Sequence, residues 1–326
     1  MKRRTFITTA IGALAGVAGS VQSQPAPVHS GAALAFGTTI SISVAHPDPE
    51  LAQQAIGEGL RAALAVDRLM SIYSADSQVY RLNRDGILRH PDPRLLEVLS
   101  MAAQLSALSD GAFDITTQPL WLAFSQAVRR GGLPDEAERC HAQALVDWRQ
   151  LKFDRDSVRF LRPGMALTLN GLAQGYAADQ ALAAVQAHGI RNALLDTGEF
   201  IARGQKALSH PWILGVRDPR NAAALAATLY AQGCSVATSG DYECTFTPDY
   251  RHHHIFEPAT GDSPSELASV TVLAPTALLA DGLSTAFMVM GWERAQALAA
   301  RLPAVGLMAI DKQGRRRRSA DFPADV

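Results

Sequence analysis

The hydrophobic pattern of the chain divides into helical and strand-like stretches. Stretches rich in Ala and Leu predict helices at residues 49–70, 93–109, 135–148, 171–188 and 275–290. End signals support several of these boundaries, because Pro49 falls in the first turn of one helix and Asp110-Gly111 stops the next. Asn170 is the expected N-cap of the fourth helix, and Gly189 lies just past its end.

Shorter stretches with alternating or β-branched residues predict strands. They fall at residues 34–45, in short pieces between 151 and 169, and at 193–195, 212–216, 226–230, 235–238, 269–274 and 305–310. Runs of neighbouring strands with separate helices favour an α+β fold over alternating βαβ units. We expect largely antiparallel sheets flanked by helices. No G-x-G-x-x-G follows the first predicted strand, so a Rossmann start has no support.

The first residues have the composition of an export signal. A Lys-Arg-Arg segment at residues 2–4 precedes small and apolar residues up to Gly19. This apolar stretch is shorter than the roughly 20 residues that span a bilayer, so we expect a cleaved signal rather than a membrane anchor. The paired arginines before Thr-Phe-Ile favour the twin-arginine route. The sequence thus predicts a signal peptide at residues 1–24, a periplasmic location and one domain over residues 25–326.

Composition and charge narrow the choice of partners. The 30 Lys and Arg residues balance 31 Asp and Glu residues, so nothing favours nucleic acid or an anionic membrane. The basic run at residues 315–318 follows a predicted turn, and a solvated edge strand explains it better than a binding site. Three cysteines do not make a disulfide framework. Cys234 and Cys244 could pair across adjacent strands, but we expect buried free thiols.

Polar clusters lie at the boundaries of the predicted elements, where loops commonly carry function. In the first, spacings of three and four place Asp281, Ser284 and Thr285 on one side of a helix. Three oxygen donors suit a hard cation such as Mg²⁺, although helix capping is the alternative role. In the second cluster, residues 236–242, a strand runs into Thr-Ser-Gly, whose hydroxyl and backbone N–H groups fit a phosphate or an ordinary turn.

Two further polar clusters are a run of three histidines and the start of a predicted helix. His252, His253 and His254 cannot all face one metal from a strand, because alternate side chains point to opposite faces. One of them acting as a base or as a phosphate donor is more reasonable than a zinc site. Residues 170–176 open a predicted helix, whose N-terminus could face a phosphate or its bound metal.

Taken in order, these segments resemble the ApbE family of flavin transferases, the FAD:protein FMN transferases. The resemblance runs from about residue 34 to residue 310. The matching segments are Phe36-Gly37-Thr38-Thr39, Met70-Ser71-Ile72-Tyr73 with Ser77 and Asn83, residues 111–116 with Pro119-Leu120, residues 171–179, residues 237–242, His253-His254-Ile255 with Pro258 and Thr260-Gly261, and residues 280–285.

The resemblance implies a cleft that holds FAD, with a divalent cation on its pyrophosphate. It implies that Asp281, Ser284 and Thr285 face Mg²⁺, that the Gly171 carbonyl is a further ligand, and that His254 is a general base. The positions that it implies at FAD are Phe36, Tyr73, Ala112, Phe113, Asp114, Thr168, Gln174 and Ile255. Core packing is the alternative role for Phe36, Phe113 and Ile255.

This sequence departs from the family pattern at several of these positions. The family often has Met at the position of Phe36, Lys or Glu at that of Gln174, and an acidic residue at that of Thr168. Residues 197–199 read Thr-Gly-Glu where Gly-Gly-Asp/Glu is usual. The departures at Gln174 and Thr168 change the charge expected near the metal and the pyrophosphate.

The implied reaction transfers FMN from FAD to a Thr or Ser hydroxyl of a target protein, with AMP as the leaving group. If water replaced the hydroxyl, the same site would act as an FAD pyrophosphatase. A periplasmic FAD-binding protein is the non-enzymatic alternative. The implied partners are FAD and an acceptor flavoprotein, which for exported family members is typically a membrane respiratory component.

Overall fold

The structure, a computed structural model, describes residues 26–207, 210–231 and 233–326. The expected signal peptide at residues 1–24 lies outside these ranges. No helix within them is long and apolar enough to cross a membrane.

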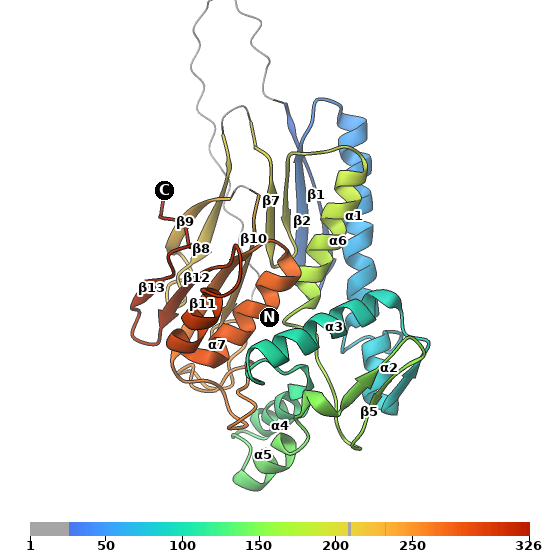
Figure 1. Cartoon of the computed structure of the whole chain (residues 1–326), viewed down its shortest axis with the longest axis vertical. Helices are drawn as coiled ribbons and strands as arrows, with labels where there is room; N and C mark the ends of the chain where they lie inside the picture. The colour runs from blue at the N-terminus through green and yellow to red at the C-terminus, as the bar shows by residue number, and fades with distance from the viewer. Residues whose placement is uncertain (1–25, 208–209, 232) are drawn as a thin grey trace, which may run out of the picture.

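An antiparallel sheet of eight strands forms the centre of the molecule (Figure 1). Its order is β1 (Val28–Ala35), β2 (Thr38–Ala45), β6 (Ala193–Asp196), β7 (Phe200–Arg203), β10 (Ser235–Gly240), β11 (Leu267–Ala274), β12 (Gly306–Asp311) and β13 (Arg316–Arg318). Two small sheets complete the β structure: β3 (Ile87–Arg89), β5 (Ser157–Phe160) and β4 (Leu151–Phe153) form one, and β8 (Trp212–Arg217) and β9 (Leu225–Ala231) form the other.

Helices cover this sheet and extend beyond one end of it. They are α1 (Pro49–Met70), α2 (Gln78–Asp85), α3 (Pro93–Leu108), α4 (Gln118–Arg129), α5 (Glu136–Gln143), α6 (Ala173–Ala187) and α7 (Ala277–Ala299), with 3₁₀ turns η1 (Ile115–Thr117) and η2 (Trp148–Gln150). Helices α1 and α6 run side by side next to β1 and β2 (Figure 1). Helix α7 packs on α6, β10 and β11, and all eight residues of β11 are buried.

The α+β fold with antiparallel sheets is confirmed, and α1 has the predicted boundaries. The stretch at 34–45 is instead a hairpin, because Phe36 and Gly37 have left-handed backbone angles, φ 52° and φ 71°, that reverse the chain. Helix α7 continues past the predicted end to Ala299, with a kink at Gly291. Helices α2 and α4 were not predicted.

Asn170 is not the N-cap of α6. The helix begins at Ala173, and Leu172 occupies the cap position without a side-chain hydrogen bond. The Ala173 N–H donates instead to the Leu169 carbonyl, so the preceding turn supplies the bond that a capping side chain would make. The predicted helix at 135–148 is shorter than expected, because α5 ends at Gln143.

The basic run forms an edge strand, as predicted. Strand β13 pairs only with β12 in the sheet order, and Arg315 binds Asp311 in the preceding turn, with Nε 2.6 Å from Oδ2. The cysteines form no disulfide among the described residues. Cys140 and Cys244 are exposed rather than buried, because they lie on α5 and in a loop at the surface.

Candidate active site

Helices α6 and α7 meet at a contact that only glycine allows. A Cβ added to Gly175 would lie 2.3 Å from the Ala277 carbonyl oxygen and 2.8 Å from the Asp281 Cβ, closer than atoms pack. The Gly175 N–H donates to the Asp281 Oδ2 at 3.0 Å. The first turn of α6 therefore lies directly against the second turn of α7.

A hydroxyl group from β10 and the segment before α6 lie next to this contact. Ser239, at the end of β10, lies with its Oγ 2.8 Å from the Ser284 Oγ and 3.2 Å from the Thr285 Oγ1. A Cβ on Gly171 would lie 2.8 Å from the Thr285 Oγ1, so the segment before α6 lies beside that hydroxyl. The four predicted metal-site residues are thus brought together, and Ser239 joins them. The Thr-Ser-Gly cluster that contains Ser239 was identified from the sequence, but the contacts of Ser239 with Ser284 and Thr285 were not predicted.

Helix capping, the alternative role for Asp281, belongs to other residues. The Asp179 carboxylate accepts the N–H groups of Ala277 and Leu278 at 2.9 Å each, and Thr276 accepts the N–H of Leu279. Asp281 lies beyond these capped positions, inside the helix. Its side chain therefore does not cap α7, and its Oδ2 instead accepts the N–H of Gly175 in the first turn of α6.

The donor chemistry of this cluster fits a hard cation. Asp281 is only 4% exposed, and burial, with a contribution from the charge of Asp179, raises the pKa of its carboxyl to about 7. A divalent cation would stabilise the ionised form and lower that pKa. Residues 26–207, 210–231 and 233–326 hold no group of three His, Cys, Asp or Glu suited to a metal. One carboxylate with hydroxyls and carbonyls suits Mg²⁺ better than zinc.

His254 lies in the loop between β10 and β11, residues 241–266. This loop, which lies entirely within the described residues, contains no strand, only two isolated bridges, between Thr245 and His253 and between Glu257 and Asp262. Both the backbone N–H and Nδ1 of His254 bind the Cys244 carbonyl oxygen, at 3.0 and 3.2 Å. A carbonyl can only accept, so Nδ1 carries the proton and the Nε2 lone pair can accept one. Burial also lowers the pKa of His254, which keeps the ring neutral at pH 7.

The other two histidines have different surroundings. His253 is fully buried, and this burial lowers the pKa of its ring to about 3. His252 binds Asp262, with Nδ1 2.7 Å from Oδ1. The three rings therefore have three different sets of neighbours.

Phe36 and Tyr73 are the accessible aromatic residues among the positions implied at FAD. Phe36 is half-buried at the tip of the β1–β2 hairpin, and Tyr73, just after α1, is 71% exposed. Partial burial and, secondly, the nearby Cys244 raise the pKa of the Tyr73 phenol. Tyr73 thus lies close to the loop that carries His254.

Gln174 and Thr168 make bonds within the protein. The Gln174 Nε2 donates to the Thr197 carbonyl at 2.7 Å, and the Thr197 hydroxyl donates back to the Gln174 carbonyl at 2.9 Å. These bonds hold the turn between β6 and β7 against α6. Thr168 is half-buried, and its Oγ1 accepts the Asn170 N–H at 3.2 Å. Neither side chain brings a charge.

The segment at 112–114 and Ile255 are built into the protein interior. Ala112, Phe113 and Ile255 are 8%, 4% and 6% exposed and belong to the main core, which supports the packing role for the last two. The Asp114 carboxylate accepts the Thr116 N–H and hydroxyl, and the Trp148 N–H at 2.9 Å. Burial raises its pKa. Asp114 therefore joins η1 to η2.

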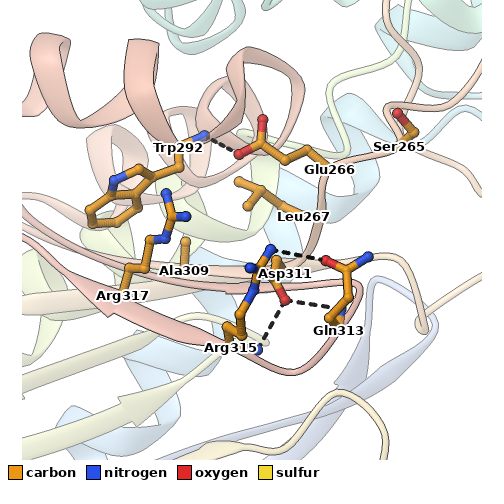
Figure 2. Close-up of a pocket in the computed structure, with 9 residues that line it drawn as sticks. All are labelled: Ser265, Glu266, Leu267, Trp292, Ala309, Asp311, Gln313, Arg315 and Arg317. Atoms are coloured by element: carbon orange, nitrogen blue, oxygen red, sulfur yellow. Dashed lines mark hydrogen bonds and ion pairs between the residues drawn. The ribbon is translucent and has the colours of Figure 1, made fainter.

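A cavity of about 320 Å³ lies away from these residues, between α7 and strands β11 to β13 (Figure 2). Trp292, Glu266 and Arg317 form part of its wall, and none of the predicted site residues lines it. Its arginines have acidic neighbours: Arg315 binds Asp311, and Arg317 lies 3.5 Å from Glu293. The chemistry described above does not use this cavity.

Known proteins with the same architecture carry flavin-transferase names. The FAD:protein FMN transferase of Salmonella typhimurium is 32% identical over 294 residues, covering 86% of this chain and 83% of that protein. The structure of "Flavin Transferase ApbE from Vibrio cholerae" has a TM-score of 0.79 and 26% identity, over 91% of this chain and 99% of that one. The apo Pseudomonas stutzeri flavinyl transferase ApbE has a TM-score of 0.79 and 30% identity, over 94% and 100%.

Fold and site together define an α+β protein with one antiparallel central sheet and an oxygen-donor cluster between two helices. The model of the ApbE family matches residues 36–309, which is most of the chain. The chain belongs to the ApbE family.

Proposed function

We propose that this protein transfers FMN from FAD to a Ser or Thr hydroxyl of an acceptor protein, in a Mg²⁺-dependent reaction that releases AMP. The convergence of Asp281, Ser284 and Thr285 with Gly171 and Ser239 carries the proposal. The names of the relatives support the reaction class.

Asp281, the hydroxyls of Ser284 and Thr285, and the Gly171 carbonyl would hold the cation. The bound cation supplies positive charge that neutralises the FAD pyrophosphate and the leaving AMP. The protein would contribute a fixed donor set, since the close contact at Gly175 and its bond to Oδ2 hold Asp281 in place.

His254 would serve as the base for the acceptor hydroxyl. Its Nε2 accepts the hydroxyl proton while the oxygen forms a bond to the phosphorus of the FMN half. The bond from that phosphorus to the bridging oxygen breaks, and AMP leaves with the electron pair. The Cys244 carbonyl, bound to Nδ1, keeps Nε2 in the accepting form.

The remaining positions would form the FAD site in different ways. Phe36 and Tyr73 offer accessible rings that can contact the flavin or the adenine. Thr168 and Gln174 would meet FAD without a side-chain charge. Ala112, Phe113, Asp114 and Ile255 would form the wall behind it, through backbone groups and packing.

The cellular setting belongs to the same proposal. We infer export of the folded protein by the twin-arginine route to the periplasm, on the composition of residues 1–24, and an acceptor among membrane respiratory flavoproteins. Replacing both Arg3 and Arg4 by Lys should keep the precursor in the cytoplasm. Unchanged periplasmic appearance on cell fractionation would contradict the route.

The decisive test combines the purified protein, FAD, Mg²⁺ and an acceptor domain. Covalent flavin fluorescence on the acceptor, with one AMP released per flavin attached, is the expected result. Release of AMP without labelled acceptor would show an FAD pyrophosphatase. FAD binding without AMP release would show a flavin-binding protein.

A further inference from the structure

The loop that carries His254 folds back on itself as two hydrogen-bonded limbs. The Phe246 N–H donates to the His252 carbonyl at 2.7 Å, and the His254 N–H donates to the Cys244 carbonyl at 3.0 Å. The position of the His254 ring therefore follows the position of the outgoing limb, which starts at Asp241.

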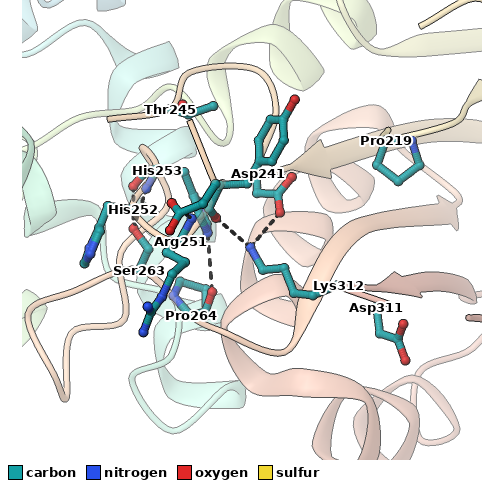
Figure 3. A network of polar contacts seen from close by, with 12 residues as sticks. Pro219, Asp241, Thr245, Arg251, His252, His253, Ser263, Pro264, Asp311 and Lys312 are labelled. Atoms are coloured by element: carbon teal, nitrogen blue, oxygen red, sulfur yellow. Dashed lines mark hydrogen bonds and ion pairs between the residues drawn. The ribbon is translucent and has the colours of Figure 1, made fainter. Parts of the chain in front are cut away.

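Asp241 fixes the start of that limb through two cations from distant parts of the chain. Its side chain is fully buried. The Arg220 guanidinium, from the β8–β9 turn, binds both carboxylate oxygens at 2.7 and 2.8 Å. The Lys312 Nζ, from the β12–β13 turn, lies 2.6 Å from Oδ2 (Figure 3). Buried charges paired in this way are costly to break, because the remaining charge stays desolvated.

The same two cations also hold the returning limb at Tyr250. The Lys312 Nζ donates to the Tyr250 carbonyl at 2.8 Å. The Arg220 guanidinium lies over the Tyr250 ring, 4.3 Å from its centroid, a cation–π distance. Lys312 therefore joins the first residue of the loop to the residue where the chain turns back toward His254.

An aromatic cluster supports the far side of the loop. Phe246 and Phe256 pack against Phe124 of α4, with ring centroids 5.3 and 5.1 Å away. This cluster is small and separate from the main core. Packing thus holds one side of the loop, while Lys312 and Arg220 hold the other.

The β12–β13 turn does not need the Lys312 side chain for its own shape. The Asp311 Oδ1 accepts the N–H groups of Gln313 and Arg315 at 2.9 Å each, and these bonds close the turn. The Lys312 side chain therefore has no part in closing the turn and instead binds Asp241 at the start of the loop.

We propose that Lys312, together with Arg220, is a positioning residue for FMN transfer: it orients His254 by joining Asp241 to Tyr250. This inference rests on the proposed function, in which His254 is the base. Lys312 needs no contact with FAD or the acceptor for this role. Its loss should slow the chemical step while leaving FAD binding intact.

The test compares Lys312→Met with Arg315→Met and Lys312→Arg. Lys312→Met keeps the Asp241–Arg220 pair, so the buried carboxylate stays paired. Arg315→Met removes an ion pair of the same turn that does not reach Asp241. Lys312→Arg keeps the cation. Each variant is measured for single-turnover FMN transfer at saturating FAD, for FAD affinity, and for hydrogen exchange of loop peptides in the absence of FAD.

We expect Lys312→Met to slow transfer by about 10–100-fold, as misplacement of a catalytic group does, with FAD affinity unchanged and exchange faster in residues 243–256. Arg315→Met should match the wild type, and Lys312→Arg should recover most of the rate.

Three outcomes would overturn the positioning role. They are a wild-type rate in Lys312→Met, an equal loss in Arg315→Met, and a loss explained wholly by weaker FAD binding. A wild-type protein that transfers no FMN, but whose loop exchange still depends on Lys312, would overturn the proposed function while leaving the loop support intact.

Discussion

The two halves of the candidate site are held in place by different forces. At the α6–α7 junction, Gly175 packs directly against the Ala277 carbonyl and the Asp281 side chain, inside the main core. In the β10–β11 loop, the buried carboxylate of Asp241, two cations and a small aromatic cluster hold His254. Close packing fixes distances at the junction, whereas buried charge pairs, which are costly to break, fix the start of the loop. Packing thus holds the proposed metal half, and paired charges with a small aromatic cluster hold the half that carries His254.

The largest effect is expected at the proposed metal half. Asp281→Ala should lower FMN transfer by at least about 10³-fold, because the only carboxylate of the donor cluster is lost. The protein should remain folded by circular dichroism. The matched control is Thr276→Ala, which removes a capping bond of the same helix and should cost about 1 kcal/mol of stability at unchanged rate. Near-normal transfer by Asp281→Ala at saturating Mg²⁺ would remove the metal assignment.

The next effect belongs to the loop half. His254→Ala should slow single-turnover transfer by roughly 10²–10⁴-fold with little change in FAD affinity. His253→Ala should have a much smaller effect on the rate, since its fully buried ring cannot reach an acceptor hydroxyl. Equal losses of rate in the two variants would indicate that both act by disturbing the loop.

The pH dependence of transfer should report the same histidine. A base must be unprotonated, so the rate should fall as the pH drops through the pKa of His254. Burial lowers that pKa, so the midpoint of this fall should lie below pH 6.5, the ordinary midpoint of histidine. A midpoint at or above that value in the free enzyme's kcat/KM profile would contradict a neutral base with a lowered pKa.

The smallest effect is expected from a single methyl group at the junction. Gly175→Ala should force α6 and α7 apart and cost about 1–3 kcal/mol of stability, together with weaker Mg²⁺ activation. Gly57→Ala in α1 is the control, because a Cβ there would meet nothing closer than an Arg61 nitrogen at 3.6 Å. That change should stabilise the protein by roughly 0.5–1 kcal/mol. Equal thermal shifts in denaturation would show that the junction is not tightly packed.

The sequence predicted what depends on local spacing. The boundaries of α1 and the common helix face of Asp281, Ser284 and Thr285 follow from neighbouring residues, and both agree with the structure. The hairpin at Phe36 was missed because a non-glycine residue takes a left-handed angle there, which alternation cannot reveal.

The sequence pattern could not predict contacts between segments that are distant in the chain. Asp241 binds residues 21 and 71 positions away in the chain, and neither Arg220 nor Lys312 belongs to a recognisable motif. Ser239 was noticed for its hydroxyl, but its approach to α7 depends on how β10 packs.

The chain order of the Asp241 partners has a consequence for biosynthesis. Arg220 emerges before Asp241, but Lys312 follows only after β11, α7 and β12 have been made. A nascent chain that already contains every metal-site residue therefore still lacks the bridge between Asp241 and Tyr250. The full rate of transfer should therefore be reached only late in synthesis, when the β12–β13 turn joins the sheet.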